Sequence, residues 1–414
     1  LILADDLTGA ADCAVAFARR GHGAAVSWEG AAGTASDTAV LAIDADSRRL
    51  SSSRAAERHG VLVAAHLLPG ASLLKKIDST LRGQPAAELA ATLAALRAAG
   101  RPSLAVVAPA FPSNGRTTLN GRVRLDGTPL EDSLLWARDH SYPTGDLVAV
   151  LEGAGLSADC LGLDRLRDGG AEAAVRAALR AGHDALVCDA IEATDLDAVA
   201  AATLPFAGRV IWVGSGGLAD ALAAGVPAGD TAAAFLTPCP RVGRGVLLAV
   251  GSVAEVSRAA VAVLSETGAA RVFAVPSSLL RRGGPAMDAL SAEIAAVLCA
   301  GGDAAVTIEA EGSVDLSQGA DLAEALALLL RPAGQVMGAL FATGGETART
   351  LLGALDVHGL HLVEEVEPGV PLGFSCGRIS VPVVTKAGGF GTSATILRAH
   401  RRLRALLDGK DSQR

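Results

Sequence analysis

The amino-acid sequence predicts an α/β protein of two α/β domains, each with a mainly parallel sheet. Short apolar runs alternate with alanine-rich helical stretches along most of the chain, which is the rhythm of βαβ units. The 414 residues, 50% of them hydrophobic, are enough for about two to three domains of roughly 150 residues. Aromatic residues supply only 3% of positions, so alanine, valine and leucine must fill the cores, as buried parallel strands and close-packed helices allow.

The first βαβ unit begins at the N-terminus. Residues 1–4 are a predicted strand, residues 5–9 a turn, and residues 10–20 a helix that ends at Gly21, where a left-handed backbone carries no Cβ strain. Further strands of the first domain are predicted at residues 39–43, 72–77, 104–108, 185–188 and 210–213. Helical stretches fill much of the sequence between them.

The alternation lapses at residues 226–245, where the sequence VPAGDTAAAFLTPCPRVGRG has the prolines and glycines of an extended connector. We therefore predict a first domain over residues 1–230, a second over 245–414, and a hinge in the connector. Strands of the second domain are predicted at residues 246–250, 304–308, 339–342 and 379–385.

Charge and cysteine usage argue against several classes of protein. The net charge is −8 and the two signs are mixed along the chain, so we expect no nucleic-acid partner and no anionic membrane surface. The six cysteines are scattered without a CxxC pair, which indicates reduced thiols and a cytoplasmic location. No apolar stretch approaches about 18 residues, and no basic and apolar leader is present, so export and membrane spanning are not predicted.

Polar side chains follow the predicted strands of the first domain, at the edge where open parallel sheets bind ligands. They are carboxylates, hydroxyls and guanidinium groups, namely Asp5, Asp6, Asp44, Asp46, Arg48, Asp78, Ser79, Arg82, Arg116, Asp189 and Ser215. Each aspartate alone is compatible with a helix N-cap, so the prediction depends on their convergence. Together they suit a small, anionic, polyhydroxylated ligand, with cations for its carboxylate and aspartates for its hydroxyls.

Three glycine-containing loops follow strands of the second domain, at residues 251–252, 343–347 and 386–391. Because glycine has no side chain, the backbone N–H groups of such loops can approach a ligand closely, as in phosphate-binding loops. The sequence contains no GxxxxGK[ST] string and no GxGxxG after its opening strand. A Walker-type or Rossmann-type nucleotide site is therefore not available, and a kinase here must be of another lineage.

Eight strings in order resemble the four-carbon acid sugar kinases across almost the whole chain. They are ADDLTGAAD (4–12), DADSR (44–48), KKIDSTLRG (75–83), PAFPSNGRTTLNG (109–121), VGSGGLA (213–219), VGS (250–252), ATGGETA (342–348) and KAGGFG (386–391). The resemblance implies an N-terminal acid-sugar domain, a C-terminal nucleotide domain, and ATP-dependent phosphorylation of the terminal hydroxyl of a tetronate, giving the 4-phosphate. KKIDSTLRG is more similar to the D-threonate and D-erythronate kinases than to the 3-oxo-tetronate or L-threonate branch.

Given this resemblance, we expect Asp5 or Asp6 to accept the proton of the attacking hydroxyl, the other reaching Mg²⁺ or capping the helix. The expected substrate-binding residues are cations for the carboxylate (Arg48, Lys76, Arg82) and partners for the hydroxyls (Asp78, Ser79). Strand alternation gives Lys76, rather than Lys75, the same parity as Asp78. The expected ATP-binding residues are Ser252, Gly344, Gly345, Glu346, Thr347 and Gly388.

Some assignments stay open. Glu346 is equally typical of a first-turn acid that stabilises its own helix, and Lys386 would either neutralise phosphate or be a solvated strand-end residue. Mg²⁺ is expected because it bridges nucleotide oxygens, with few protein ligands. The active site would lie in the interdomain cleft, where hinge closure excludes water.

Two other classes of function compete with a kinase. A phosphatase or lyase would use the acidic edge alone, and a non-enzymatic acid-sugar sensor would keep the cleft without a nucleotide. ATP binding separates the kinase from both. The expected partners are a small acid sugar, ATP and a second copy of the chain in a homo-oligomer.

Overall fold

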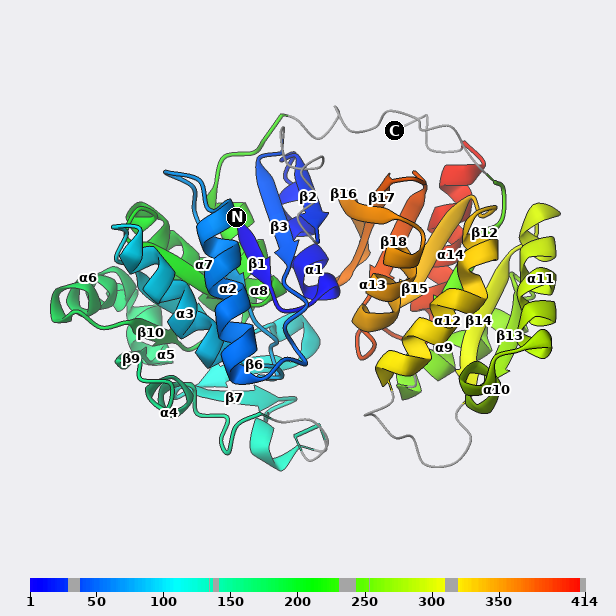
Figure 1. Ribbon diagram of the computed structural model, residues 1–414. Helices are drawn as coiled ribbons and strands as arrows, with labels where there is room; N and C mark the ends of the chain where they lie inside the picture. The colour runs from blue at the N-terminus through cyan, green and yellow to red at the C-terminus, as the bar shows by residue number, and fades with distance from the viewer. Residues whose placement is uncertain are drawn as a thin grey trace. The chain divides into compact units, whose positions relative to one another are not determined.

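The computed structural model describes residues 1–28, 38–133, 135–136, 141–230, 243–252, 254–309 and 319–409. The chain divides into two compact units, drawn in Figure 1. The first unit comprises Leu1–His22 and Val40–Gly229, and the second comprises Gly23–Ala39 and Asp230–Arg414. Both are α/β units, which confirms the predicted fold class. The predicted connector falls largely on residues 231–242, which lie outside the described residues.

The sheet of the first unit is parallel throughout, with the strand order β3-β1-β4-β11-β5-β10-β9. In that order its strands are Val40–Asp44, Ile2–Ala4, Leu74–Lys76, Val210–Gly214, Leu104–Ala108, Ala185–Cys188 and Ala158–Leu161. Almost every residue of these strands except β9 is buried, because helices cover both faces of the sheet. A small antiparallel sheet of β6 (Arg116–Leu119), β7 (Arg122–Leu125) and β8 (Thr128–Pro129) accompanies it.

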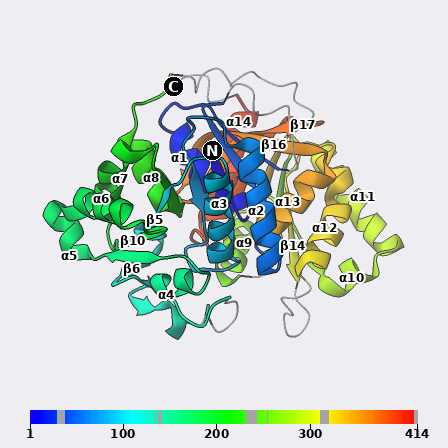
Figure 2. The ribbon, with the colours of Figure 1, turned by 60° about the vertical axis from the view of Figure 1, so that its left-hand side comes forward.

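Helices of the first unit form a layer on each side of this sheet. On one side, α2 (Ser52–His66) and α3 (Pro85–Ala98) pack against each other, as Figure 2 shows, and α3 contributes Leu89, Leu93 and Leu96 to the core. On the other, α7 (Ala193–Thr203) packs against α8 (Gly216–Gly225), and α8 against α1 (Leu7–Ala18). The unit also contains α4 (Leu147–Glu152), α5 (Leu163–Arg165) and α6 (Ala171–Ala181).

The second unit has the strand order β13-β14-β12-β15-β18-β17-β16-β2. The first five strands are parallel, namely Arg271–Pro276, Ala304–Glu309, Val246–Val250, Ala339–Thr343 and Pro382–Lys386. The last three are antiparallel, namely β17 (Val370–Gly377), β16 (Val357–Glu367) and β2 (Ala24–Ser27). Residues Gly23–Ala39, which we predicted within the first domain, are grouped with the second unit by their contacts, and β2 pairs with β16 of that unit.

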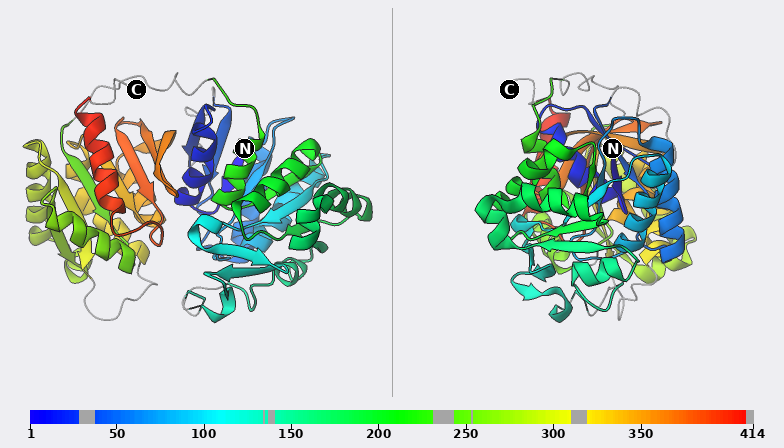
Figure 3. Two further views of the ribbon diagram at one scale, coloured as in Figure 1. Left: turned by 180° about the vertical axis from the view of Figure 1, so that it is seen from behind. Right: turned by 90° about the vertical axis from the view of Figure 1, so that its left-hand side faces the viewer.

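Helices again cover this sheet. On one face, α9 (Glu255–Glu266) and α14 (Thr395–Leu407) pack together, as the left view of Figure 3 shows, and Leu264, Ile396 and Leu403 join the core. The remaining helices are α10 (Ser277–Arg282), α11 (Pro285–Cys299), α12 (Gly319–Gly334) and α13 (Gly345–Ala354). In the described part of the chain, none of the helices has the length and apolar character needed to cross a membrane.

Candidate active site

The predicted polar residues of the first unit meet because they follow three neighbouring parallel strands. β1 lies between β3 and β4, and Ala4 is level with Asp44 on one side and with Lys76 on the other. The segments that leave the carboxyl ends of these strands therefore emerge side by side. They carry Asp5 and Asp6, then Arg48, then Asp78 to Arg82.

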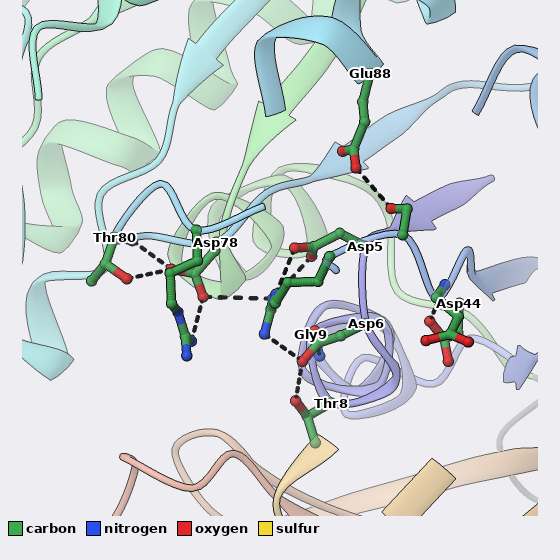
Figure 4. A network of polar contacts seen from close by, with 12 residues as sticks. Asp5, Asp6, Thr8, Gly9, Asp44, Asp78, Thr80 and Glu88 are labelled. Atoms are coloured by element: carbon green, nitrogen blue, oxygen red, sulfur yellow. Dashed lines mark hydrogen bonds and ion pairs between the residues drawn. The ribbon is translucent and has the colours of Figure 1, made fainter. Parts of the chain in front are cut away.

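Arg48 contacts three carboxylates of this cluster, those of Asp5, Asp6 and Asp78, which Figure 4 labels. Its Nε donates to Asp5 Oδ2 at 2.7 Å, and its Nη2 donates to Asp5 Oδ1 at 3.0 Å, so the guanidinium binds both oxygens of Asp5. Its Nη1 donates to Asp6 Oδ2 at 2.7 Å, and Nη2 also lies 3.5 Å from Asp78 Oδ2. The guanidinium of Arg48 thus directs its N–H donors at three carboxylates of the protein itself. A lysine cannot reproduce this planar, multidentate geometry.

Asp78 is held by the turn in which it lies. Its Oδ1 accepts from the backbone N–H of Thr80 at 2.9 Å and from the Thr80 hydroxyl, and its Oδ2 accepts from Arg82 Nη2 at 2.6 Å. Burial alone would raise the pKa of Asp78, but Arg82, followed by Arg48, outweighs burial and holds that pKa well below its usual value. Asp78 is therefore a permanent anion that fixes Arg82. Ser79 is buried in the same turn.

Asp6 caps helix α1. Its Oδ1 accepts from the backbone N–H of Gly9 at 2.9 Å, and its Oδ2 accepts from the Thr8 hydroxyl at 2.8 Å. A Cβ atom on Gly9 would lie 2.7 Å from Asp6 Oδ1 and 2.8 Å from Lys76 Nζ, so any larger residue here would displace these two side-chain ends. Burial opposes ionisation of Asp6, but Arg48 and Lys76 prevail and lower its pKa. The helix-capping role is thus present together with the ion pair.

The two neighbouring lysines of β4 have separate surroundings. Lys76 lies with the aspartates, and although burial favours its neutral form, Asp5 and other acidic neighbours raise its pKa. Lys75 is fully buried with its Nζ 2.7 Å from Glu88 Oε2 of helix α3. The parity argument that placed Lys76, rather than Lys75, with the polar edge therefore matches the structure.

The glycine loops of the second unit also follow neighbouring strands. Thr343 of β15 is level with Val250 of β12 and with Lys386 of β18, so the three loops begin at one edge of the sheet. A Cβ atom on Gly251 would lie 2.0 Å from Thr347 Oγ1, and one on Gly388 would lie 2.7 Å from Ser252 Oγ. The hydroxyls of Thr347 and Ser252 therefore lie directly against glycine backbone.

Helix α13 begins at this edge. Gly344 is its N-cap and has a φ of 95°, a left-handed conformation that favours glycine. Gly345, Glu346 and Thr347 form its first turn, where backbone N–H groups have no acceptor within the helix and the helix dipole favours an anion. The structure thus brings together Ser252, Gly344, Thr347 and Gly388.

Of the two expectations for Lys386, the structure contradicts the solvated strand-end residue. Its ammonium donates to the carbonyl oxygens of Ala387 at 2.9 Å, Gly388 at 3.2 Å and Phe390 at 2.7 Å, and the residue is 1% exposed. Burial lowers its pKa to about 8. Lys386 holds the shape of the third glycine loop from inside, and it is not a solvated strand-end residue.

Several residues of the site were not assigned from the sequence. Thr8 and Thr80 lie two residues after aspartates and bind them, a spacing typical of Asx-type turns that offered a usable signal. Glu88 and Ser47 gave none, because their contact joins segments far apart in sequence. Within the described ranges, no three His, Cys, Asp or Glu side chains gather as a metal site.

Comparison with known proteins also divides the chain into two parts with different binding functions. Residues 1–222 match the family described as "Sugar-binding N-terminal domain", and residues 247–396 match the family described as "Nucleotide-binding C-terminal domain". The aspartate and arginine cluster therefore lies in the region that matches the sugar-binding family, and the three glycine loops lie in the region that matches the nucleotide-binding family.

Full-length relatives support the same conclusion. The chain is 46% identical to a D-threonate kinase of Cupriavidus necator, covering 96% of each chain. It is 35% identical to a D-threonate kinase of Bordetella bronchiseptica, covering 97% of each. The crystal structure of a Salmonella typhimurium LT2 protein described as a tRNA synthase shares the fold, with a TM-score of 0.79, 20% identity and coverage of 97% and 98%. The chain belongs to the four-carbon acid sugar kinase family.

Proposed function

We propose that this protein is an ATP-dependent kinase that phosphorylates the terminal hydroxyl of D-threonate. The observation that carries the proposal is the pairing, in one chain, of a buried aspartate–arginine cluster in the sugar-binding unit with three glycine loops in the nucleotide-binding unit. The first suits a polyhydroxylated acid and the second suits a phosphate chain. The names of the two relatives support D-threonate among the tetronates.

Asp6 is our choice for the group that accepts the proton of the attacking hydroxyl. The side chain of Asp6 is 16% exposed, against 3% for Asp5, whose two oxygens both accept from Arg48. A substrate hydroxyl can therefore reach Asp6 more easily. Phosphoryl transfer has a loose transition state, so an oriented carboxylate of low pKa suffices to align the nucleophile.

Arg82 is our choice for the residue that binds the carboxylate of the substrate. Its side chain is 33% exposed and uses Nη2 to bind Asp78, and its Nε is buried without a hydrogen-bond partner among the described residues, so this donor is available for a ligand. Arg48 instead holds Asp5 and Asp6 in place, a role that differs from the carboxylate contact expected from the sequence. We keep Lys76, Asp78 and Ser79 as substrate-facing residues of the same cluster.

The triphosphate would lie against the three glycine loops. Ser252, Gly344, Gly345, Glu346, Thr347 and Gly388 remain our candidates for ATP contact. Hydroxyls and backbone N–H groups dominate this set, which fits phosphate, and the Ser252 and Thr347 hydroxyls are oxygen ligands of the kind Mg²⁺ accepts. These hydroxyls would hold Mg²⁺, which would supply positive charge to offset that of the triphosphate.

Transfer also requires the two clusters to meet. We propose that the units close around bound ligands and exclude water, which would otherwise hydrolyse ATP. Small-angle X-ray scattering with and without ATP and D-threonate tests this: the radius of gyration should fall only when both are present.

A coupled ADP-release assay tests the function. Mg·ATP is offered with D-threonate, D-erythronate, L-threonate or 3-oxo-tetronate, and unrelated sugars serve as controls. We expect the highest kcat/KM with D-threonate. A higher value with another tetronate would correct the substrate and keep the reaction, whereas absence of both turnover and calorimetric ATP binding would overturn the proposal in favour of a sensor or a phosphatase.

A further inference from the structure

A second polar cluster lies beneath the active-site residues of the first unit, and it consists of Ser47, His59, Lys75 and Glu88. All four are at most 1% exposed. Ser47 donates to Glu88 Oε1 at 2.7 Å, and Lys75 Nζ binds Glu88 Oε2 at 2.7 Å (Figure 4 shows Glu88). His59 Nε2 lies 3.0 Å from Ser47 Oγ. Since Ser47 gives its hydrogen to Glu88, His59 is the donor in that contact.

The cluster is electrically balanced. Lys75 and Glu88 form an ion pair, and burial, followed by the charges of Lys75 and Arg58, lowers the pKa of His59 so that its ring is neutral. A buried pair of this kind gives little net stability compared with apolar residues of similar size. Its presence therefore calls for another explanation, and the position of Ser47 supplies one.

Ser47 directly precedes Arg48. The backbone N–H groups of Ser47 and Arg48 donate to the carbonyl oxygen of Asp5 at 3.0 and 3.3 Å, which couples this loop to the start of helix α1. Asp46, on the other side of Ser47, has a φ of 47°, a left-handed conformation that is uncommon for residues with a Cβ atom, although aspartate adopts it more readily than most. A loop in this conformation persists only if its surroundings fix it.

We propose that Ser47 and Glu88 are positioning residues for the reaction. The Ser47 hydroxyl, inserted between Glu88 of α3 and His59 of α2, locks the loop that follows β3 and so sets where the Arg48 guanidinium meets Asp5 and Asp6. Neither Ser47 nor Glu88 touches substrate. This inference rests on the proposed function for its kinetic test but not for its structural one.

Ser47→Ala is the first test, with Thr203→Val as its matched control. Thr203 is also a buried hydroxyl of the first unit: it donates to Val199 O at 2.7 Å and accepts from Trp212 Nε1 at 2.9 Å. A misplacement of about 1 Å costs on the order of 10²-fold in rate. We expect kcat to fall about 10- to 100-fold in Ser47→Ala with KM for ATP unchanged, and to stay near wild type in Thr203→Val at a similar loss of Tm.

Two double variants separate positioning from folding. Lys75→Met with Glu88→Gln removes both charges but keeps a side-chain carbonyl that accepts from Ser47. Lys75→Met with Glu88→Leu removes the charges and the acceptor together. The positioning role predicts kcat near wild type for the first and a fall to the Ser47→Ala level for the second. Equal kcat in the two double variants would overturn it.

Hydrogen exchange gives a readout that does not need turnover. The amides of Ser47 and Arg48 should exchange at least about 10-fold faster in Ser47→Ala than in wild type, under conditions where global opening is negligible. Unchanged exchange there would overturn the inference even if the protein proves inactive on every tetronate. Inactivity of the wild-type protein, with faster loop exchange in Ser47→Ala, would instead count against the proposed function alone.

Discussion

Arg48→Met tests whether the guanidinium holds the active-site carboxylates together. The substitution keeps an unbranched, flexible stem but removes the guanidinium contacts to Asp5 and Asp6, at 2.7 to 3.0 Å, and to Asp78 at 3.5 Å. Removing one partner of a buried ion pair costs about 3–5 kcal/mol. For a unit of this size that corresponds to a fall in Tm of about 6–20 °C.

The pH dependence carries the sharper test. In the wild type, the pKa values of Asp6 and Asp78 are lowered in the folded state, so their contribution to stability is present above the unfolded pKa of about 3.9 and is lost as pH falls. In Arg48→Met the pKa of Asp6 should rise above the unfolded value. Its ionisation then opposes folding, and stability is lost as pH rises.

The difference in unfolding free energy between wild type and Arg48→Met should therefore be largest near pH 7 and should shrink toward pH 4. Urea unfolding, which adds no ionic screening, measures it at a series of pH values. Arg19→Met is the control, because Arg19 pairs with Asp220 at 3.5 Å with both side chains 45% exposed, and such pairs contribute about 0–1 kcal/mol. A difference for Arg48→Met that is independent of pH would refute the reasoning.

The other predictions concern single groups. Asp6→Asn should lower kcat by ~10²-fold or more while the helix cap survives, since asparagine also accepts from the Gly9 N–H; near-wild-type turnover in both Asp5→Asn and Asp6→Asn would remove the aspartates from catalysis. Gly388→Ala should raise KM for ATP by about tenfold, equivalent to about 1.4 kcal/mol, because the new Cβ would meet Ser252 Oγ; an unchanged KM would separate this loop from ATP. KM for ATP should also rise as pH passes about 8, because Lys386 then becomes neutral and has two N–H donors for three carbonyl oxygens. In Lys386→Arg, which stays protonated, KM for ATP should depend less on pH. This rise in KM would not reflect unfolding, because the lowered pKa of Lys386 in the folded state makes the protein more stable as pH increases. A wild-type KM for ATP that does not change with pH would contradict the prediction.

The sequence was sufficient to predict the edge at which each group of residues lies. Alternating apolar and helical stretches give parallel strands, and the residues after β1, β3 and β4 must then emerge together, as Asp5, Arg48 and Asp78 do. The same reasoning applied to β12, β15 and β18 in the second unit. Local periodicity is enough for these results because each depends on a strand and its following turn.

Contacts between segments far apart along the chain could not be predicted from the sequence. Strand β2 follows helix α1 along the chain but pairs with β16, more than 300 positions later, and nothing in its four residues encodes that partner. The donors of Arg48 were expected to bind substrate, yet they bind Asp5 and Asp6, because side-chain partners depend on rotamers and on loop shape. Ser47 and Glu88 were overlooked for the same reason.

Phosphorus NMR of the reaction product tests the central claim most directly. The terminal carbon of D-threonate is a CH₂ group, whereas its other two hydroxyl-bearing carbons are CH groups. After incubation with Mg·ATP and D-threonate, we predict ADP and a new phosphomonoester whose ³¹P signal is coupled to two protons on one carbon. A signal coupled to a single proton, or inorganic phosphate as the only new species, would contradict transfer to the terminal hydroxyl.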